Sequence, residues 1–368
     1  MKSYNHLYEK FISDENIDLA IKNAAKGKKD RKSVKRYLAD ENFHNVIKTY
    51  AEDFHNASHK PIEIYDGIQR KKRTIIVPTF KEQVIHHMAV NVLQPIFMHG
   101  MYEHSYGSIP NRGAHKGKKT IEKWISKGGK DFKYCLKMDI SKYFNSIPHN
   151  ILIHNLRKVI HDDRFMKVLE EIISVMPNGV GIPLGFYISQ WTANWYLQGL
   201  DHYIKENLRA KYYIRYMDDM VVFGANKKIL HAIKNNIKIY LENNLGLKLK
   251  GNWQVFRFNY CCRYRFLDFM GFKFYRNRTT LRRNIFFKAV RKARRIYKKN
   301  CITIHSARQM LAYIGWFSCT KTYSAYQNYI KPFVNIQYLK RRLSNYDKRQ
   351  NRRNNENQLV QIGKYSCA

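Results

Sequence analysis

The feature that most constrains this chain is an acidic pair, Asp218-Asp219, set inside the apolar and aromatic stretch from Lys211 to Gly224. Tyr, Ile, Val and Phe favour strands, so this stretch predicts a β-hairpin with the two carboxylates at its turn. Adjacent carboxylates break the strand pattern, and such local violations collect at functional sites. Taken alone, however, the pair fits an ordinary surface turn better than a functional site.

A second stretch, residues 132–148, predicts a strand that ends at Asp139, followed by a turn and by a helix that starts near Pro148. Carboxylates at two strand ends can converge in one domain. Two unit charges about 4 Å apart repel by about 4 kcal/mol at an effective dielectric near 20. Such a cluster therefore holds cations or changes its proton affinities.

Hard oxygen ligands without a nearby His–Cys pattern favour Mg²⁺ or Mn²⁺ over zinc. Two such ions, about 3.5–4 Å apart, clamp the attacking and leaving oxygens of an in-line phosphoryl transfer. The two acidic stretches together therefore predict the chemistry of a polymerase or a nuclease.

Four segments, in their order along the chain, resemble the motifs of reverse transcriptases. Lys71–Pro78 resembles the fingers segment that contacts the incoming triphosphate, and Gly181–Gln190 resembles the Pro-Gln-Gly…Ser-Pro segment. Lys137–Phe144 and Tyr216–Asp219 resemble the two catalytic motifs. The resemblance runs from about residue 60 to about residue 340 and implies an α+β right-hand polymerase fold. In such a fold, the palm is an antiparallel sheet with helices, and it lies between fingers and a helical thumb.

The resemblance also suggests how the chain is divided. The expected parts are a helical N-terminal extension at 1–57, fingers with part of the palm at 58–138, the palm at 139–276, the helical thumb at 277–345, and a basic disordered tail at 346–368. The extension is interpreted either as a solvated linker or as an arm that contacts RNA phosphates or a partner.

Site roles follow from the same resemblance. It implies that Asp139, Asp218 and Asp219 are catalytic and hold two Mg²⁺ ions, for which Mn²⁺ can substitute, with the Ile140 carbonyl completing the metal shell. Expected to bind the dNTP are Lys71, Arg73, Phe144 (as a steric gate against the ribose 2′-OH), Leu184, Gly185 and Gln190. Expected to contact nucleic acid are Arg112, Ser189, Met270, Gly271, Lys288, Arg291, Lys292 and Arg295. The proton donor to pyrophosphate stays unassigned, because Lys250 is near the family's position but out of register.

Two departures from the common pattern point to a subfamily. Most relatives carry Gln where this chain has Leu184, and Pro where it has Gln190. This form resembles the reverse transcriptases of diversity-generating retroelements, which copy a template RNA with frequent errors at adenines. Loss of one hydrogen bond of about 0.5–1.5 kcal/mol weakens discrimination by roughly two- to thirteen-fold. Neutral drift at Leu184 is the alternative.

This subfamily implies mutagenic retrohoming with a small, basic, oligomeric accessory protein. The other interpretations are an antiviral-defence, abortive-infection or retron-like reverse transcriptase and, from another class, a non-catalytic RNA-binding scaffold with a polymerase fold. A group II intron enzyme fits less well, because no maturation or endonuclease extension follows the thumb pattern.

The charge supports a polyanionic partner. Sixty-seven Lys and Arg against 28 Asp and Glu give a net charge of +39, which favours template RNA, cDNA and their hybrid as partners. The sequence contains no run of 18 apolar residues and no signal-peptide pattern, so no membrane partner is expected. The predicted location is the cytoplasm of a bacterium, for a bacterial or phage gene. The six cysteines lack zinc-type spacing and are expected to be reduced thiols.

Helical periodicity predicts the remaining framework. The expected helices are Phe80–Phe97, Tyr187–Asn207, Lys227–Asn244, Arg282–Lys299, Ala307–Phe317 and Tyr323–Leu339. In the thumb helix Arg282–Lys299, the spacing predicts a packing face made of Phe286, Val290, Ala293 and Tyr297, with a cationic face beside it.

Overall fold

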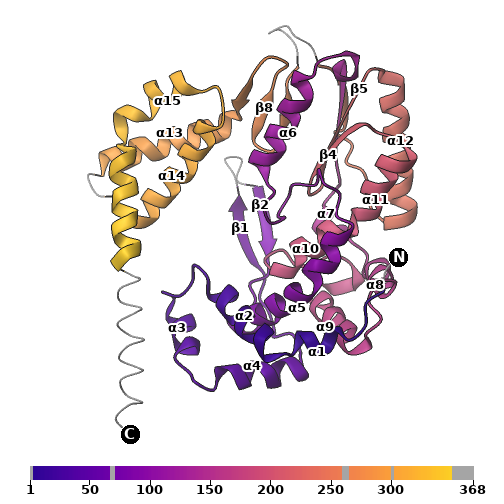
Figure 1. Ribbon diagram of the computed structural model, residues 1–368, viewed down its shortest axis with the longest axis vertical. Helices are drawn as coiled ribbons and strands as arrows, with labels where there is room; N and C mark the ends of the chain where they lie inside the picture. Colours follow the sequence, from indigo (N-terminus) through magenta and orange to yellow (C-terminus); the bar gives the residue numbers. More distant parts are fainter. Residues whose placement is uncertain (1–2, 67–70, 259–264, 300–301, 350–368) are drawn as a thin grey trace. The chain divides into compact units, whose positions relative to one another are not determined.

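The structure is a computed structural model that describes residues 3–66, 71–258, 265–299 and 302–349 of the chain. Its helices and antiparallel sheets confirm the predicted α+β class (Figure 1). The chain divides into two compact units, Met1–Arg257 and Phe258–Ala368. The candidate acidic site belongs to the first unit.

A four-stranded antiparallel sheet forms the centre of the first unit, with strand order β4-β5-β3-β6. The strands are β3 (Tyr134–Asp139), β4 (Tyr212–Tyr216), β5 (Asp219–Gly224) and β6 (Gln254–Arg257). The predicted strand ending at Asp139 and the predicted hairpin around Asp218 are both confirmed. Their buried aliphatic and aromatic side chains hold the sheet on the core, so its strand ends are fixed in position.

Helices cover this sheet and surround its lower end. Helix α12 (Lys227–Leu245) packs on β3, β5 and β6, and Figure 1 shows it beside the sheet. Its C-terminal cap is Gly246 at φ 60°, a left-handed conformation that glycine adopts without steric cost. Helix α10 (Tyr187–Tyr196) packs on the long helix α5 (Phe80–His99), which begins with a capping box formed by Thr79 and Glu82.

The other elements of this unit are one hairpin and several short and longer helices. They are the hairpin β1 (Ile62–Asp66) and β2 (Lys71–Ile75), then α6 (Ala114–Ser126), η1 (Lys130–Phe132), α7 (Tyr143–Ser146), α8 (His149–Arg157), α9 (Asp163–Ser174), η2 (Pro177–Gly179), α11 (Gln198–His202) and η3 (Tyr203–Asn207). The predicted helix Tyr187–Asn207 is therefore divided into α10, α11 and η3, the last of which is a π-helix.

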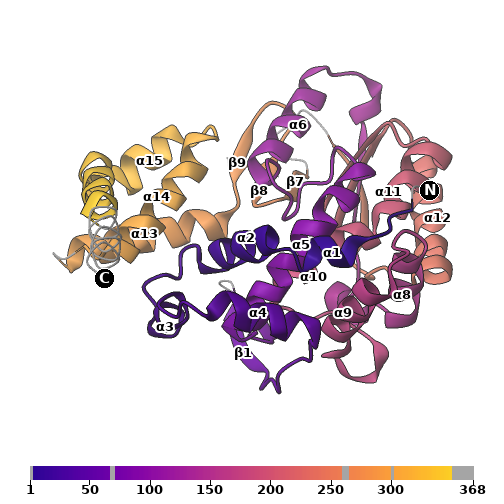
Figure 2. The ribbon, with the colours of Figure 1, turned by 60° about the horizontal axis from the view of Figure 1, so that its bottom comes forward.

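The N-terminal helices belong to the core, so the solvated-linker interpretation is wrong. They are α1 (Leu7–Phe11), α2 (Asp14–Ala25), α3 (Lys32–Leu38) and α4 (Phe43–Glu52). Phe11, Ile17 and Ile47 have no solvent exposure. Figures 1 and 2 both show α1, α2 and α4 around α5, against which all three pack.

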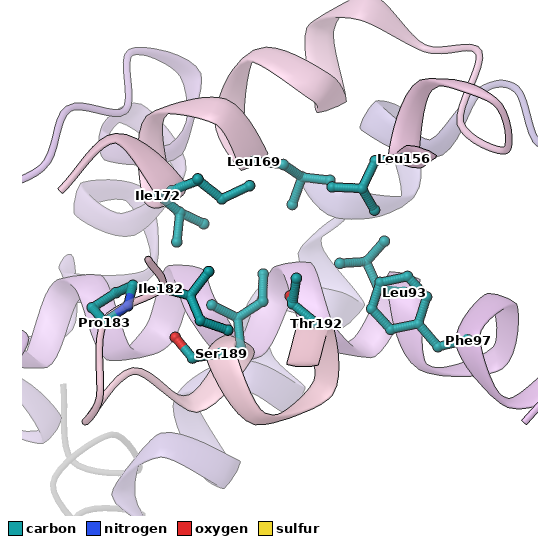
Figure 3. A pocket seen from close by; sticks show the side chains of 11 residues that line it. Leu93, Phe97, Leu156, Leu169, Ile172, Ile182, Pro183, Ser189 and Thr192 are labelled. Atoms are coloured by element: carbon teal, nitrogen blue, oxygen red, sulfur yellow. The ribbon is translucent and has the colours of Figure 1, made fainter. Parts of the chain in front are cut away.

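Below the sheet, α5, α8, α9 and α10 enclose an apolar cavity of about 10 Å³ (Figure 3). Leu93, Leu169 and Ile182 are among its lining residues. A space of this size holds about one water molecule. It is therefore a packing defect of the core and not a substrate site.

The second unit contains a three-stranded antiparallel sheet, β7 (Leu267–Phe269), β8 (Phe272–Phe274) and β9 (Thr279–Leu281), followed by helices. The helical elements are α13 (Arg283–Lys298), α14 (Ile304–Ser318), α15 (Tyr323–Tyr329) and η4 (Lys331–Phe333), and residues 336–349 are also helical. The packing face predicted for α13 is partly wrong. Ala289 and Ile296 are buried beside Val290 and Ala293, whereas Tyr297 is 62% exposed.

No helix in the described ranges is both long and apolar enough to span a bilayer. The Cys135 thiol is buried, and the Cys319 Sγ donates a hydrogen bond to the Trp316 carbonyl at 3.2 Å. Four cysteines, Cys261, Cys262, Cys301 and Cys367, lie outside the described residues, as does the tail from 350 onward.

Candidate active site

The sheet register brings the three predicted aspartates to one end of the palm. Asp139, the last residue of β3, pairs directly with Asp219, the first residue of β5. Asp218 occupies the turn between β4 and β5, one residue away from that pair. Residues so far apart in the sequence meet because β3 lies next to β5 in the sheet.

The turn that carries Asp218 has an unusual backbone. Met217 has a φ of 55°, in the left-handed region that non-glycine residues seldom occupy. A residue held in this conformation costs of the order of 1–3 kcal/mol, and such residues cluster at functional sites. The surrounding structure therefore holds this turn against its local preference.

The electrostatics of the cluster are those of crowded like charges. The pKa of Asp218 is raised to about 6, first by burial and then by the negative charges of Asp139 and Asp219. Asp139 and Asp219 keep 27% and 31% of their side-chain surface exposed. The three oxygen-rich groups thus face solvent with an excess of negative charge.

Two lysines partly neutralise this excess. The Lys250 Nζ lies 3.0 Å from Asp139 Oδ2, and the Lys137 Nζ lies 3.8 Å from Asp219 Oδ1. The hydrogen bond to Asp139 raises the pKa of Lys250. Both ammonium groups stand where a cation lowers the repulsion between the carboxylates.

The donor set fits a hard divalent cation, because all three side chains offer carboxylate oxygens. Within the described ranges, no three or more His, Cys, Asp or Glu side chains are already arranged as a metal site. Lys250 and Lys137 contact two of the three carboxylates. The Ile140 carbonyl is available on the same side: Ile140 forms a bridge with Leu249, flanked by Lys250 N–Asp139 O and Ser141 N–Lys248 O hydrogen bonds. In this pattern the peptide groups of Ile140 point away from Leu249, toward the β5 side.

The backbone of Ile76, the residue after strand β2, is joined to the Gly181–Gln190 segment. The Ile76 N–H donates to the Leu184 carbonyl at 2.8 Å. A Cβ on Gly185 would lie 2.1 Å from the Ile76 carbonyl oxygen, and Gly185 has a φ of 115°, so only glycine fits there. Leu184, half-buried, lines a cavity of about 480 Å³ together with Thr74 and Ile76.

Phe144 lies against the same segment. Its carbonyl accepts a hydrogen bond from Ile182 N at 2.7 Å, and its half-buried ring makes an edge contact with Tyr143. The structure thus brings Phe144, Leu184 and Gly185 into one contiguous region with β2. Arg73 on that strand is exposed, and the side chain of Lys71 lies outside the described part of the chain.

Other predicted site residues lie in different settings. Gln190 is exposed on α10, whereas the Ser189 side chain is only 3% exposed and lines the apolar cavity of Figure 3. Arg112 donates through Nη1 to the carbonyls of Tyr102 and Ser105, so its guanidinium fastens its own loop. Contacts of Ser189 and Arg112 with nucleic acid remain predictions.

The remaining predicted residues lie in the second unit. Met270 and Gly271 form the turn of the β7–β8 hairpin, with φ of 51° and 85°. On α13, Arg291 and Arg295 are exposed, while Lys288 and Lys292 are half-buried. Lys292 Nζ lies 3.1 Å from Ser306 Oγ.

Sequence reasoning missed several residues around the acidic cluster. Lys250 was left unassigned because its position was counted along the chain, whereas the strand-like pairing of residues 248–250 with 139–141 brings it to Asp139. Arg215 was also missed. It is fully buried and paired with Asp201, and a charged residue at an inward position of an apolar strand was the available signal.

The family model "Reverse transcriptase (RNA-dependent DNA polymerase)" matches residues 59–273, more than half of the chain. The chain belongs to the reverse transcriptase family. With the antiparallel palm sheet, this match confirms the predicted polymerase fold. Enzymes of this family generally use Mg²⁺.

Individual relatives are distant. Protein YkfC of Escherichia coli (strain K12) is 24% identical over 220 residues, which are 49% of this chain and 58% of that protein. The group II intron-encoded protein LtrA of Lactococcus lactis subsp. cremoris is 28% identical over 154 residues, 39% of this chain and 24% of that protein. This reverse transcriptase chain therefore matches less than two thirds of either relative's length. Among solved structures, a C-terminally truncated apo telomerase from Candida tropicalis has a TM-score of 0.47 and 14% identity, covering 65% of this chain and 59% of its own.

Proposed function

We propose that the chain is an RNA-directed DNA polymerase that copies a template RNA into cDNA by nucleotidyl transfer. The observation that carries this proposal is the convergence of Asp139, Asp218 and Asp219 at one end of the palm sheet, in a chain of the reverse transcriptase family. Clustered carboxylates repel one another, and a polymerase uses this electrostatic cost to hold cations.

In this mechanism, the three carboxylates and the Ile140 carbonyl would hold two Mg²⁺ ions. When bound, the ions supply activation of the primer 3′-oxygen and neutralise the charge of the leaving pyrophosphate. The protein's own contribution is positional. Arg73 offers a planar fork to the triphosphate, while Phe144 beside Ile182 limits space at the ribose 2′ position.

Primer extension on an RNA template, with Mg²⁺ and dNTPs, tests the activity. We expect incorporation by the wild-type chain and its loss in Asp218→Asn, with RNA affinity unchanged. Asp131→Asn is the matched control, since Asp131 is a half-buried aspartate paired with Lys211 away from the cluster. RNA binding without incorporation by the wild type would instead indicate a non-catalytic scaffold.

We further propose that the enzyme is of the diversity-generating type and makes frequent errors at adenines. Leu184 supports this, because its backbone is fixed on the fingers strand at Ile76 and its aliphatic side chain cannot offer the amide hydrogen bond that Gln provides. Sequencing cDNA made by wild type and by Leu184→Gln tests it. We expect fewer errors at template adenines in the variant, by up to about tenfold, and a Leu184→Met variant that keeps the wild-type error rate.

The relatives favour a second candidate, a reverse transcriptase of the group II intron type, because LtrA is described as a group II intron-encoded protein. The same sequencing experiment separates the two. Equal and accurate copying of adenines by the wild type and by Leu184→Gln would contradict the mutagenic type and favour an intron-type or defence enzyme.

The second unit is proposed to bind the template–product duplex through α13. Arg291 and Arg295 are exposed on it, and the helix buries its opposite, apolar face. Phosphate contacts of this kind release counterions and make affinity depend on salt. Replacing both arginines by Gln is expected to weaken RNA–DNA binding and to lower the salt dependence of the affinity, measured between about 50 and 200 mM salt.

A further inference from the structure

A buried polar network lies directly behind the turn that carries Asp218. Its centre is Arg215 on β4, which has no exposed surface and whose partner Asp201 on α11 has none either. The Arg215 Nε and Nη2 donate to the Asp201 carboxylate at 2.8 and 2.6 Å. Asp201 alone thus neutralises the charge of Arg215, so the contacts of Arg215 with the turn are not needed for this purpose.

The remaining donors of Arg215 connect the turn to α10. Nη1 donates to the Met217 carbonyl at 3.1 Å and to Asn194 Oδ1 at 3.2 Å, while Nη2 donates to the Asn194 carbonyl at 3.3 Å. All five N–H groups of the guanidinium therefore have acceptors. The Met217 carbonyl that it holds belongs to the left-handed residue just before Asp218.

The other side of the turn is closed by Gly107. A Cβ on Gly107 would lie 2.5 Å from Met217 Cγ and 2.7 Å from Met217 N, so the loop backbone rests directly against the turn. Asn194 Nδ2 donates to the Gly107 carbonyl at 2.7 Å. The loop is further tied to β4, because Tyr106 N donates to the Arg215 carbonyl and Arg215 N donates to the His104 carbonyl.

Stability alone does not account for this arrangement. Apolar side chains of similar volume often replace a buried ion pair without loss of stability, but an apolar side chain cannot donate to the Met217 carbonyl. The network also connects helix α10, strand β4 and the loop at Gly107 to the turn that carries Asp218.

We propose that Arg215, Asn194 and Gly107 are positioning residues that fix the Met217–Asp218 turn in the conformation needed for divalent-cation binding. Asp201 acts one step further back, by orienting Arg215. This inference rests on the proposed function, because it takes Asp218 as a cation ligand. Residues that orient ligands in this way commonly change metal affinity about 10- to 100-fold when they are replaced.

Two variants test the proposal without removing a carboxylate. Arg215→Lys keeps the charge opposite Asp201 but has three donors instead of five. Gly107→Ala leaves the ion pair intact and places a methyl group against Met217 N. The matched control is Tyr196→Phe, which removes a buried hydrogen bond of similar type, from Tyr196 OH to the Leu245 carbonyl at 2.7 Å, elsewhere in the unit.

The readouts are Mn²⁺ binding to the full chain, followed by the paramagnetic resonance of free Mn²⁺, and the Mg²⁺ concentration for half-maximal incorporation. Asp218→Asn defines Mn²⁺ bound elsewhere, and thermal unfolding identifies folded variants. For Arg215→Lys and Gly107→Ala, we expect Mn²⁺ binding at least about tenfold weaker and a higher Mg²⁺ requirement. Tyr196→Phe is expected to match the wild type in both.

Wild-type Mn²⁺ affinity in the folded Gly107→Ala and Arg215→Lys variants would overturn the inference while leaving the proposed function intact. An equal loss of Mn²⁺ affinity in Tyr196→Phe would also overturn it, because removing a buried hydrogen bond far from the turn would then have the same effect. Identical Mn²⁺ binding by wild type and Asp218→Asn would overturn the proposed metal site together with this inference.

Discussion

Two carboxylate sites in the first unit, Asp201 and the cluster of Asp139, Asp218 and Asp219, differ in burial and in the pairing of their charge. Asp201 is fully buried, accepts from Arg215 and from Tyr213 OH, and forms a neutral, completely satisfied pair. Asp139, Asp218 and Asp219 remain partly exposed, and Lys250 and Lys137 lie 3.0 and 3.8 Å from Asp139 and Asp219. The two groups are joined through Arg215, which contacts Asp201 and the carbonyl of Met217.

The difference shows which charges serve the fold and which remain able to bind a ligand. A buried carboxylate with matched donors gains fold specificity and has no capacity left for a ligand. A crowded cluster of carboxylates is costly in the free protein, and binding a cation lowers the repulsion between them. Substitutions at the two sites should therefore change stability with opposite sign.

The largest effect is expected for Asp201→Asn. The variant leaves the Arg215 guanidinium buried without its counter-charge, which typically costs about 3–5 kcal/mol. Urea unfolding of the full chain would measure the loss. Asp201→Leu combined with Arg215→Met should recover most of that stability, because the buried charge is then gone. A double variant as unstable as Asp201→Asn would show that the pair contributes something besides charge compensation.

Asp218→Asn should have the opposite sign. In metal-free buffer at neutral pH, this change removes one of three mutually repelling charges, and the free energy of unfolding should rise by about 2–3 kcal/mol at most. The raised pKa of Asp218 reflects the same burial and repulsion. The comparison would fail if Asp218→Asn destabilised the chain as Asp201→Asn does.

The sequence predicted the acidic cluster well, because Asp139 and Asp219 sit at the ends of strands whose residues favour β structure and Asp218 lies in the adjoining turn. The sequence did not predict which oppositely charged side chains pair with the buried and the clustered aspartates. Arg215 and Asp201 lie 14 residues apart on a strand and a helix, and only the tertiary contact shows that they pair. The same holds for Lys250, whose neighbourhood with Asp139 depends on pairing between residues 111 positions apart.

Burial was predicted less well than helicity. The sequence predicted a helical extension at 1–57 and the helix α13, but Ile17 in α2 is buried because α5, far along the sequence, packs on α2. On α13, the buried face is rotated toward Ala289 and Ile296, so Tyr297 is left exposed. A helical pattern shows which residues share a face, whereas its partner decides how much of that face is covered.

His86 provides a third case, a polar group that is buried but neither charged nor compensated. Neither ring nitrogen has a hydrogen-bond partner among the residues that the structure describes, and the ring packs on Phe186. Burial lowers its pKa to about 3, and of the groups facing it the charge of Glu82 opposes this while His87 and His59 reinforce it. We expect His86→Leu to stabilise the chain by about 1–2 kcal/mol at pH 7.

The pH dependence has a defined sign. Between pH 6.5 and 3, unfolded His86 binds a proton that the folded form does not, so wild-type stability should fall as pH decreases through this window. Urea unfolding at several pH values should show a shallower fall in His86→Leu. His87→Leu is the matched comparison, since the pKa of His87 is lowered less, to about 4. Parallel pH profiles for wild type and His86→Leu would contradict this assignment.

The smallest effect on stability is expected when Lys250, the cationic partner of Asp139, is replaced. Its ammonium group contacts Asp139 at the surface, where an ion pair contributes about 0–1 kcal/mol. Lys250→Met should therefore leave the unfolding free energy nearly unchanged. It should, however, tighten Mn²⁺ binding a few-fold, because Lys250 no longer occupies Asp139 Oδ2. Lys248→Met, two residues away in the same segment and exposed, controls for the general loss of positive charge. Equal Mn²⁺ affinity in both variants would mean that Lys250 does not compete with the cation for Asp139.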